Sequence, residues 1–468
     1  MRVFVIPAYL LLAASAYLSA SAEVIHLKNG DVIYADEVKE DSSTVQYQVG
    51  DNSFTIPKSR VASIEAAPTS APSGHAIGVP TFTPEVQVRG EQDLLDQVVH
   101  NQEVDRGALA TIEAQHNPEL SAVAYYLAGK SEFAAGRFAE SKRDFQTALR
   151  FQPDNPAVLT YYAAVLVRTG SALDAISYAR RATEVVPDSP DAFATLGYAE
   201  FSAGRLQDAI QSWKKSLSYR PDATVAQLLA KAQRDASAES NYSERESGHF
   251  ILRFEGNQSS DTFRDQLLST LESEYQDLAH TFGTEPRSSI RVVLYTSQAF
   301  FDVTRAPSWM GALNDGQLRI PLRGVDSVTP QLARILKHEL THSFIGDITA
   351  HRCPAWLNEG IAQMLEPRLL GGRTAQLAQL FLAERDIPLN MLERSFSSLS
   401  SEEAALAYDE SLFAASYLYG HYGMQDMVRV LQRIGAGDSP ESSLRSVLHA
   451  DYGSLESDMR AELRHSGN

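Results

Sequence analysis

Residues 23–66 alternate between apolar and polar positions, the pattern of strands that bury one face. The two halves read VIHLKNGDVIYADEV and TVQYQVGDNSFTIPKSRVASIE. An Asn-Gly pair at 29–30 and a Gly-Asp pair at 50–51 are hairpin turn signals between β-branched runs. The pattern predicts a small all-β module, an antiparallel barrel or sheet of SH3-like or Sm-like type, that serves packing or adaptor purposes. Residues 67–90 are rich in Pro, Ser, Thr and Gly, which predicts a linker.

A 34-residue period follows the linker. Four sets of three residues repeat at this spacing: Gly136, Gly170 and Gly204; Pro153, Pro187 and Pro221; Gly129, Ala163 and Gly197; Ala148, Ala182 and Ser216. Residues 120–222 therefore resemble tetratricopeptide repeats, in which small residues let paired helices approach and proline ends each second helix. With flanking helices over 92–115 and 224–235, we predict an all-α repeat domain over 91–236. The repeats fit either a groove that binds a protein partner or a plain spacer.

The chain changes character after residue 245. HFILRFEG and SIRVVLYTS read as strands on either side of a long helical stretch, and GALNDGQLRIPL reads as a further strand. The remaining pattern is mainly helical. We predict an α+β domain over 245–468, with a sheet packed on helices. Together the regions predict a multidomain chain.

One helix of this domain carries the candidate chemistry. VTPQLARILKHELTHSFIGDI has apolar residues at helical spacing, and Thr329-Pro330 is a helix start signal. His338 and His342 lie four residues apart, so both imidazoles project from one helix face and can bind one zinc ion. Glu339 lies beside them. The competing interpretation is a solvated helix face that carries two histidines.

A second motif, WLNEGIAQMLE, begins 14 residues after His342. Catalytic zinc takes three protein ligands and keeps one position open. Glu359 is the candidate third ligand, on a second helix packed antiparallel to the first. The intervening residues suffice for a helix end, a loop and a return.

HELTH followed by PAWLNEGIAQ resembles the gluzincin metallopeptidases, the zincin-like peptidase-MA domains. The resemblance implies that His338, His342 and Glu359 ligate Zn²⁺. It also implies hydrolysis of a peptide or protein substrate by a zinc-activated water, with Glu339 as general base. Gluzincins commonly supply a downstream tyrosine that stabilises the oxyanion, and Tyr408 is our candidate. His421 and Tyr422 are the alternatives for that role.

One segment departs from the aminopeptidase pattern. Those enzymes carry G-A-M-E-N, whose glutamate holds the free amine of the substrate, whereas this chain reads GALND at 311–315. Asn314 stands in place of the glutamate, which favours an endopeptidase. The segment remains a candidate edge strand for pairing with substrate. Cys353 lies six residues before Glu359, and we expect it to be a structural cysteine rather than a ligand.

The net charge bears on the class of partner, and the N-terminal residues bear on the cellular location. The net charge is −18, from 41 basic and 59 acidic residues, and such a surface disfavours nucleic acid as a partner. Residues 1–22 combine one arginine, an apolar run and Ala20-Ser21-Ala22, which predicts a cleaved secretory signal. An uncleaved anchor is the alternative. We expect no membrane span after cleavage. Cys353 is the only cysteine, so no intramolecular disulfide can form.

These patterns predict an exported zinc peptidase, periplasmic or secreted, with an N-terminal repeat scaffold. The alternative is an envelope interaction protein whose zinc-binding protease fold has little or no turnover. The presence of Glu339 favours the enzyme, because a purely structural zinc site needs no base.

Overall fold

The structure is a computed structural model, in which the chain forms two compact units. One unit contains the N-terminal strands, and the other contains the repeats with the C-terminal domain. The described residues are 23–28, 32–35, 37–49, 52–66, 82–86, 91–100, 103–256, 259–304, 312–322, 327–366, 377, 379–381, 386–396, 399 and 401–466. The predicted signal (1–22) and the two predicted hairpin turns (29–30 and 50–51) lie outside them.

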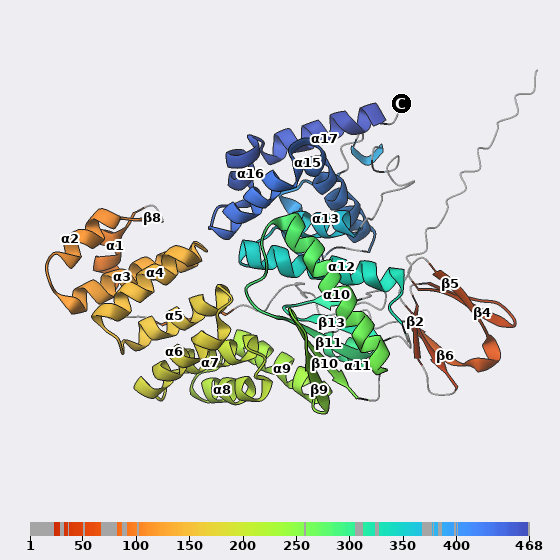
Figure 1. Cartoon of the computed structure of the whole chain (residues 1–468), viewed down its shortest axis with the longest axis horizontal. Helices are drawn as coiled ribbons and strands as arrows, with labels where there is room; N and C mark the ends of the chain where they lie inside the picture. The colour runs from red at the N-terminus through yellow and green to blue at the C-terminus, as the bar shows by residue number, and fades with distance from the viewer. Residues whose placement is uncertain are drawn as a thin grey trace, which may run out of the picture. The chain divides into compact units, whose positions relative to one another are not determined.

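The N-terminal unit contains two antiparallel sheets of three strands each (Figure 1). The first has the order β2-β1-β6, with β1 (Glu23–Leu27), β2 (Val32–Ala35) and β6 (Val61–Ala66). The second has the order β3-β4-β5, with β3 (Glu37–Glu40), β4 (Thr44–Val49) and β5 (Asn52–Pro57), and the 3₁₀ turn η1 (Lys58–Arg60) follows. Ile25, Leu27 and Val45 form its buried core. The antiparallel strands agree with the period-two pattern, while an SH3-like or Sm-like type stays a prediction.

Three helix pairs form the repeats, and one further helix follows them. Their bounds are α3 (Pro118–Ala134) with α4 (Phe138–Phe151), α5 (Pro156–Arg168) with α6 (Ala172–Val185), α7 (Pro190–Ser202) with α8 (Leu206–Tyr219), and then α9 (Ala223–Ala238). Before them come α1 (Glu91–Val98), β7 (Val99–His100), β8 (Glu103–Val104) and α2 (Arg106–Glu113). A Cβ on Gly129 would lie 2.7 Å from the Phe145 ring, and one on Gly197 would lie 2.6 Å from the Trp213 ring. The small residues therefore permit the close approach of paired helices, as the periodicity predicted.

Part of the predicted linker packs on the repeats. Residues 82–86 form no helix or strand, and burial alternates along them as in an extended segment: the side chains of Phe82 and Pro84 are buried while Thr83 and Glu85 are exposed. Phe82, only 4% exposed, belongs to the hydrophobic core of the last repeat. Sequence composition could not indicate this, because a five-residue apolar alternation inside a Pro- and Thr-rich stretch is too short to stand out.

The C-terminal domain is built on a mixed five-stranded sheet of order β12-β13-β11-β10-β9 (Figure 1). Its strands are β9 (Tyr242–Glu246), β10 (Phe250–Glu255), β11 (Ile290–Thr296), β12 (Leu313–Asn314) and β13 (Leu318–Leu322). The central strands β10, β11 and β13 are parallel, and the edge strands β9 and β12 pair antiparallel to their neighbours. The predicted α+β arrangement is therefore present, and GALND ends in an edge strand as expected.

Helices carry the rest of this domain. They are α10 (Asp261–Phe282), α11 (Ser297–Thr304), α12 (Pro330–Thr349), α13 (Ala355–Leu365), α15 (Ser401–Gly435), α16 (Pro440–Leu448) and α17 (Tyr452–Ser466), with the 3₁₀ turn η3 (Met391–Glu393). α15 breaks at Gly423, whose φ is +77°. Side chains from the sheet, α10, α12, α13 and α15 share one buried core. Within the described residues no helix is long and apolar enough to cross a membrane.

The repeats dock on the C-terminal domain through their turns. Gly136, Gly170 and Gly204 follow the first helices of the pairs and have φ values of +75°, +79° and +77°. Three arginines donate hydrogen bonds to carbonyls there: Arg352 to Gly136 (3.3 Å), Arg287 to Thr169 (3.2 Å) and Arg291 to Ser202 (3.2 Å). The carbonyls at a helix C-terminus lack intrahelical partners and carry partial negative charge, so a guanidinium is favourable there.

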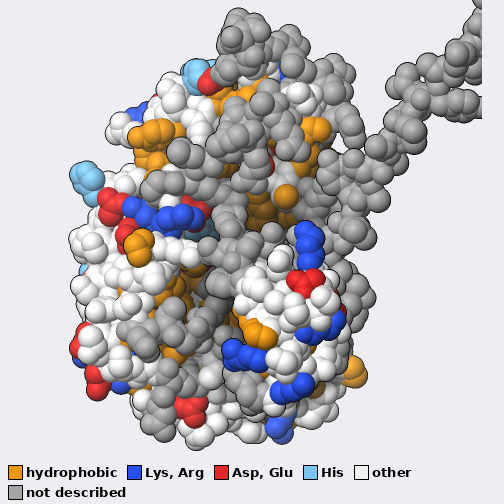
Figure 2. All heavy atoms as spheres, turned by 90° about the vertical axis from the view of Figure 1, so that its right-hand side faces the viewer, with side chains coloured by type: hydrophobic (Ala, Val, Ile, Leu, Met, Phe, Trp, Pro, Cys, Tyr) orange, Lys and Arg blue, Asp and Glu red, His pale blue; other side chains and the backbone are white. Residues whose placement is uncertain are grey.

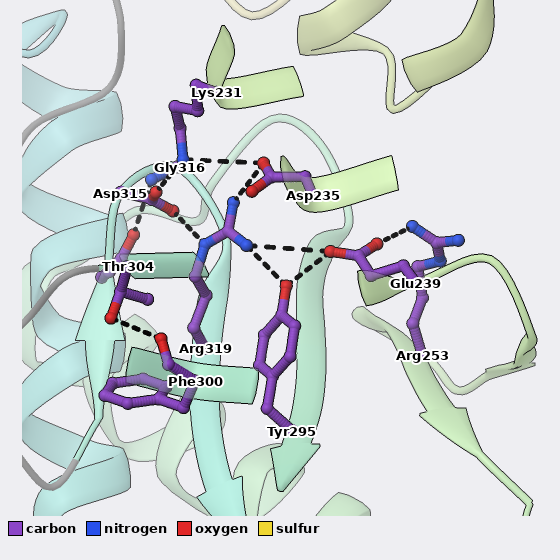
Figure 3. Close-up of polar contacts among 11 residues, drawn as sticks. Lys231, Asp235, Glu239, Arg253, Tyr295, Phe300, Thr304, Asp315, Gly316 and Arg319 are labelled. Atoms are coloured by element: carbon purple, nitrogen blue, oxygen red, sulfur yellow. Dashed lines mark hydrogen bonds and ion pairs between the residues drawn. The ribbon is translucent and has the colours of Figure 1, made fainter. Parts of the chain in front are cut away.

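A buried ionic network joins α9 to the sheet (Figure 3). Arg319 of β13 is fully buried and lies at its centre. Its guanidinium donates to Asp235 (2.8 Å), Asp315 (2.9 Å) and the Tyr295 hydroxyl (2.5 Å). Lys231 contacts Asp315 (2.6 Å), and Arg253 pairs with Glu239, which accepts from the Tyr295 hydroxyl at 2.5 Å. The acids of α9 thus neutralise cations of the sheet.

The surface charge is mixed where it can be seen. On the face in Figure 2, several Lys and Arg side chains gather at the lower right, while Asp and Glu side chains lie scattered elsewhere, some of them beside Lys and Arg. The excess of acidic residues in the sequence is therefore not concentrated on the described part of this face.

Candidate metal centre

α12 presents the two histidines. The Thr329 side chain accepts a hydrogen bond from the amide of Leu332 (3.1 Å), and Pro330 is the first helical residue, so the helix starts where the sequence indicated. Its buried face packs into the domain core. His338 and His342 project from the same side of the helix, with ring centroids 4.8 Å apart. The four-residue spacing therefore brings the two imidazoles together.

α13 brings Glu359 to the same place. Its carboxylate oxygens lie 3.6 Å from His338 Nε2 and 3.8 Å from His342 Nε2. Trp356 is fully buried and anchors the helix. A Cβ on Gly360 would lie 2.2 Å from the Ser411 carbonyl oxygen of α15, so this position requires glycine for close helix packing. The sequence motif predicted that Glu359 lies near the two histidines, and its role as a ligand stays a prediction; the packing partner of Gly360 could be found only in the structure.

Further groups hold the outward-facing nitrogens of the two rings. His342 Nδ1 lies 3.0 Å from Asn358 Oδ1, a hydrogen-bond distance. His338 Nδ1 lies 3.5 Å from Glu366 Oε2, an ion-pair distance. Both Nε2 atoms consequently face Glu359. Sequence reasoning had placed Asn358 only as a motif position and had missed Glu366, although Glu366 follows Glu359 by seven residues, about two helical turns.

Burial and mutual charge shift the pKa values of this cluster. Burial alone favours neutral His338, but Glu359, Glu339 and Glu366 outweigh it and raise its pKa to about 9. Burial would also raise the pKa of Glu359, but His342 and His338 outweigh it and hold the pKa below its ordinary value. Burial raises the pKa of Glu339 despite both histidines. The two carboxylates therefore differ: Glu359 favours the ionised form and Glu339 holds a proton more readily.

Asn314 ties the edge strand to the helix of the histidines. Its Nδ2 donates to the backbone carbonyl of Glu339 (2.8 Å) and to the Ser343 hydroxyl (2.6 Å). Its Oδ1 accepts from the amide of Gly316 (3.1 Å). Asn314 thus has a positioning contact to the backbone of Glu339, and its correspondence to the amine-binding glutamate of aminopeptidases stays a prediction.

The other candidates lie around this cluster. The Tyr408 ring packs edge-on against Phe396, and its backbone carbonyl accepts from Gln363 of α13 (2.9 Å). His421 Nδ1 contacts the Tyr417 carbonyl at 2.9 Å, and its ring stacks on that tyrosine. The role of Tyr408, and of the alternatives His421 and Tyr422, stays a prediction.

Cys353 has an environment that suits a neutral thiol. Burial, and then the Glu359 carboxylate, raise the pKa of the Cys353 thiol well above its ordinary value. A thiol must lose its proton to ligate a metal. These surroundings favour the structural role expected from the sequence.

The donor set fits a zinc ion. Two nitrogens and one carboxylate make the three-ligand set of catalytic zinc, and the ligand atoms all lie within 4.8 Å of one another. Two ligand atoms bound at about 2.1 Å in tetrahedral geometry lie about 3.4 Å apart. The two His–Glu359 distances of 3.6 and 3.8 Å are close to this value, so a small side-chain adjustment brings these donors onto one ion. The His342 Nδ1 contact with Asn358 matches the outer hydrogen bonds that orient histidine ligands, while His338 Nδ1 has only the ion-pair contact with Glu366.

A cavity of about 380 Å³ borders this centre. One part of its wall is formed by His342, Ser343 and Asn358, and another by the ends of α5 and α7 of the repeats. Its size is that of ordinary ligand sites, roughly 300–1,000 Å³. The repeats therefore help to form the surroundings of the candidate centre.

Comparison with known families supports both regions. Residues 272–465 match the Peptidase MA superfamily, and residues 126–190 and 165–224 match the tetratricopeptide repeat. The chain contains a Peptidase MA superfamily domain and tetratricopeptide repeats. The Peptidase MA match includes both helices of the candidate centre, so the two predicted kinds of domain are confirmed at this level, while their bounds stay predictions.

Individual relatives match over a small part of the chain. The small glutamine-rich tetratricopeptide repeat-containing protein 2 of Mycosarcoma maydis is 27% identical over 116 residues, 24% of this chain and 33% of that protein. The Hsp70-Hsp90 organizing protein of Triticum aestivum is 29% identical over 111 residues, 24% of this chain and 19% of that protein. The chain thus spans a third or less of each of these relatives.

A solved structure, the TPR2AB-domain:pHSP90-complex of yeast Sti1, covers 62% of this chain and 98% of that chain at 16% identity. Its TM-score of 0.24 is too low to support a shared arrangement.

Proposed function

We propose that this protein is an exported zinc peptidase of the gluzincin type that acts as an endopeptidase. The observation that carries the proposal is the convergence of His338, His342 and Glu359 beside Glu339, inside a Peptidase MA superfamily domain. Export to the periplasm or beyond rests on the signal-like residues 1–22.

The residues present would divide the chemistry between them. His338, His342 and Glu359 would hold zinc, which acts as a Lewis acid and lowers the pKa of water from about 16 toward 7. Glu339 is the general base: its carboxylate accepts a proton from the attacking water and delivers it to the leaving amine.

Substrate would lie beside the edge strand. β12 is at the end of the sheet, and an extended peptide can add to such an edge through backbone hydrogen bonds. Asn314 has no charge to hold a free amine and is engaged with Glu339 and Ser343. An internal segment of a protein is therefore favoured over a chain end.

The repeats are proposed to recruit or present a protein partner. The alternative function is an interaction protein whose zinc-binding fold has little turnover. It draws support from the curated relatives, which match stretches of about the length of the repeats and are named for repeats or for chaperone organisation.

Metal content and cleavage test the proposal together. We expect about one zinc per purified chain by mass spectrometry, and cleavage of a peptide library that a chelator abolishes and zinc restores. The His338→Ala, His342→Ala double variant should lose both. Zinc without cleavage in the native chain would favour the interaction protein, and full zinc occupancy in the double variant would refute the ligand assignment.

A further inference from the structure

The repeats bind a segment of their own chain. Residues 82–86, FTPEV, lie extended against the first helices of all three pairs. The Tyr126 hydroxyl of α3 donates to the Val86 carbonyl (3.0 Å), and the Tyr161 hydroxyl of α5 donates to the Pro84 carbonyl (2.6 Å). The Glu85 amide donates to Asp191 of α7 (3.1 Å).

These hydrogen bonds are made to backbone atoms of residues 82–86. The three groups contacted are two carbonyls and one amide, which any extended peptide presents. Asp191 is held in place by Arg220, whose guanidinium donates to both of its carboxylate oxygens at 2.9 and 3.1 Å. The polar contacts therefore favour an extended conformation without selecting side chains.

Two side chains supply the selection. Phe82 lies 6.4 Å from Tyr198, centroid to centroid, and is 4% exposed. Pro84 is buried two residues later, while Thr83 and Glu85 face solvent. Proline suits its position because it has no amide to leave unpaired and is preset for extended backbone. The surface thus accepts an extended peptide with an aromatic residue two positions before a proline.

We propose that this face of the repeats is a peptide-binding site that the chain's own residues 82–86 occupy, and that a partner protein with an extended aromatic-x-proline segment replaces them. The proposal rests on the part of the proposed function that gives the repeats a protein partner. It does not depend on hydrolysis or zinc.

The size of the contact permits exchange. Among the described residues the contact comprises residues 82–86, with three hydrogen bonds and two buried side chains, and residue 91 of α1 comes only five positions after Val86. So short a tether gives an effective concentration of about 1 mM. For an intrinsic dissociation constant of about 0.1 mM, the tethered segment would weaken an added peptide roughly tenfold rather than exclude it.

Peptide binding to the full chain tests this proposal. The probe is a fluorescein-labelled peptide of residues 79–89, VPTFTPEVQVR, titrated with native chain and with the Phe82→Ser, Pro84→Ser variant, and followed by anisotropy. We expect binding about tenfold tighter to the variant, because its own segment no longer competes. A peptide with serine in place of the phenylalanine and proline should bind neither chain.

Two tyrosine variants supply the matched control. We call the Phe82→Ser, Pro84→Ser chain the opened variant. Tyr161→Phe, made in the opened variant, removes the hydrogen bond that the Tyr161 hydroxyl donates to the carbonyl at position 84, and it should weaken peptide binding by about two- to tenfold. Tyr125→Phe should leave it unchanged, because the Tyr125 hydroxyl on α3 donates instead to Glu113 (2.7 Å).

Circular dichroism decides whether the opened variant is folded. Three results would each overturn the proposal: equal peptide affinity for the native chain and the opened variant, no binding to either, and unfolding of the opened variant. Unfolding would mean that residues 82–86 are a structural element of the repeats. Cleavage and zinc are measured separately, so loss of the peptidase assignment would leave this result standing.

Discussion

Individual residues in the candidate centre acquire different roles from position alone. Glu339 and Glu359 are chemically identical, yet burial raises the pKa of the first while His342 and His338 hold the pKa of the second down. The spacing in HELTH predicted that Glu339 lies beside the two histidines, and the resemblance of WLNEG to the gluzincin motif implied that Glu359 joins them from a second helix. Glu366 could not be predicted, because its contact with His338 Nδ1 depends on how α13 sits on α12.

Substituting each of these glutamates should separate the two roles. Glu339→Gln should retain zinc and fold while hydrolysis falls by about 10²–10⁴, the usual contribution of a general base. Glu359→Gln should instead lower zinc content, because a neutral amide is a poorer ligand than a carboxylate. Mass spectrometry and peptide cleavage on the two variants side by side give the answer. If both kept zinc and activity, the peptidase assignment would fail.

Glu410 of α15 should make stability depend on pH. It is 1% exposed, and burial raises its pKa from 4.5 to about 8, although its carboxylate accepts from the amide of Ile387. A raised pKa in the folded state means that protonated Glu410 is favoured there, so its contribution is full below about pH 4.5 and is lost as pH rises toward 8.

Glu410→Gln should remove the pH-dependent contribution of Glu410 to the free energy of unfolding. Relative to native chain, the variant should gain free energy of unfolding between pH 5 and 8, on the order of a few kcal/mol. Denaturant unfolding across this range, with chelator present throughout, measures it. Glu441→Gln is the control variant, because the Glu441 side chain is only half-buried and pairs with Arg445. A constant difference between Glu410→Gln and native chain would contradict the assignment.

At the scale of elements, periodicity predicted the repeats well and their contacts poorly. The 34-residue step located Gly136, Gly170 and Gly204, since a turn that needs positive φ selects glycine whatever lies outside it. It carried no information about Arg352, Arg287 and Arg291, which come from a distant part of the chain. For the same reason residues 82–86 were assigned to a linker.

Because these turns dock on the C-terminal domain, replacing two similar glycines by alanine should lower the free energy of unfolding by different amounts. Gly204 and Gly283 both follow a helix with positive φ, but a Cβ on Gly204 would lie 2.3 Å from the Arg291 guanidinium, while nothing lies within 4 Å of one on Gly283. Alanine at either position should cost roughly 1–2 kcal/mol for left-handed backbone. Gly204→Ala should cost about 1 kcal/mol more, because Arg291 must move from the Ser202 carbonyl.

Denaturant unfolding of the two variants measures this difference. Repeating Gly204→Ala in an Arg291→Ala background should reduce its cost to that of Gly283→Ala. Equal costs in the native background would show that the arginine contact adds nothing.

At the scale of the larger unit, the structure joins what the sequence separated. The predicted repeat domain ended at residue 236, after the flanking helix that follows the 34-residue pattern, yet α9 continues to Ala238 and places Asp235 and Glu239 against Arg319. The ionic network uses residues from four elements far apart in the chain, and no local pattern reports such partners. The repeats and the peptidase domain are consequently expected to unfold together.

Arg319→Met tests that coupling. The change removes the central cation and leaves Asp235 and Glu239, which are 0% and 4% exposed, with fewer partners. Burial alone would raise the pKa of Asp315, but Arg319 and Lys231 hold it below its ordinary range, so part of this support is present at neutral pH and is lost as pH falls. Loss of one partner of a buried ionic group typically costs about 3–5 kcal/mol.

Calorimetry on the full chain should show the repeats and the peptidase domain melting together in native protein, and at a lower temperature or in two steps in the variant. Arg429→Met is the matched control, because Arg429 pairs with Asp426 on the exposed side of α15 and such pairs contribute at most about 1 kcal/mol. If Arg319→Met melted like Arg429→Met, the network would not hold the two domains together, because a buried cation that truly balances three acids cannot be removed without cost.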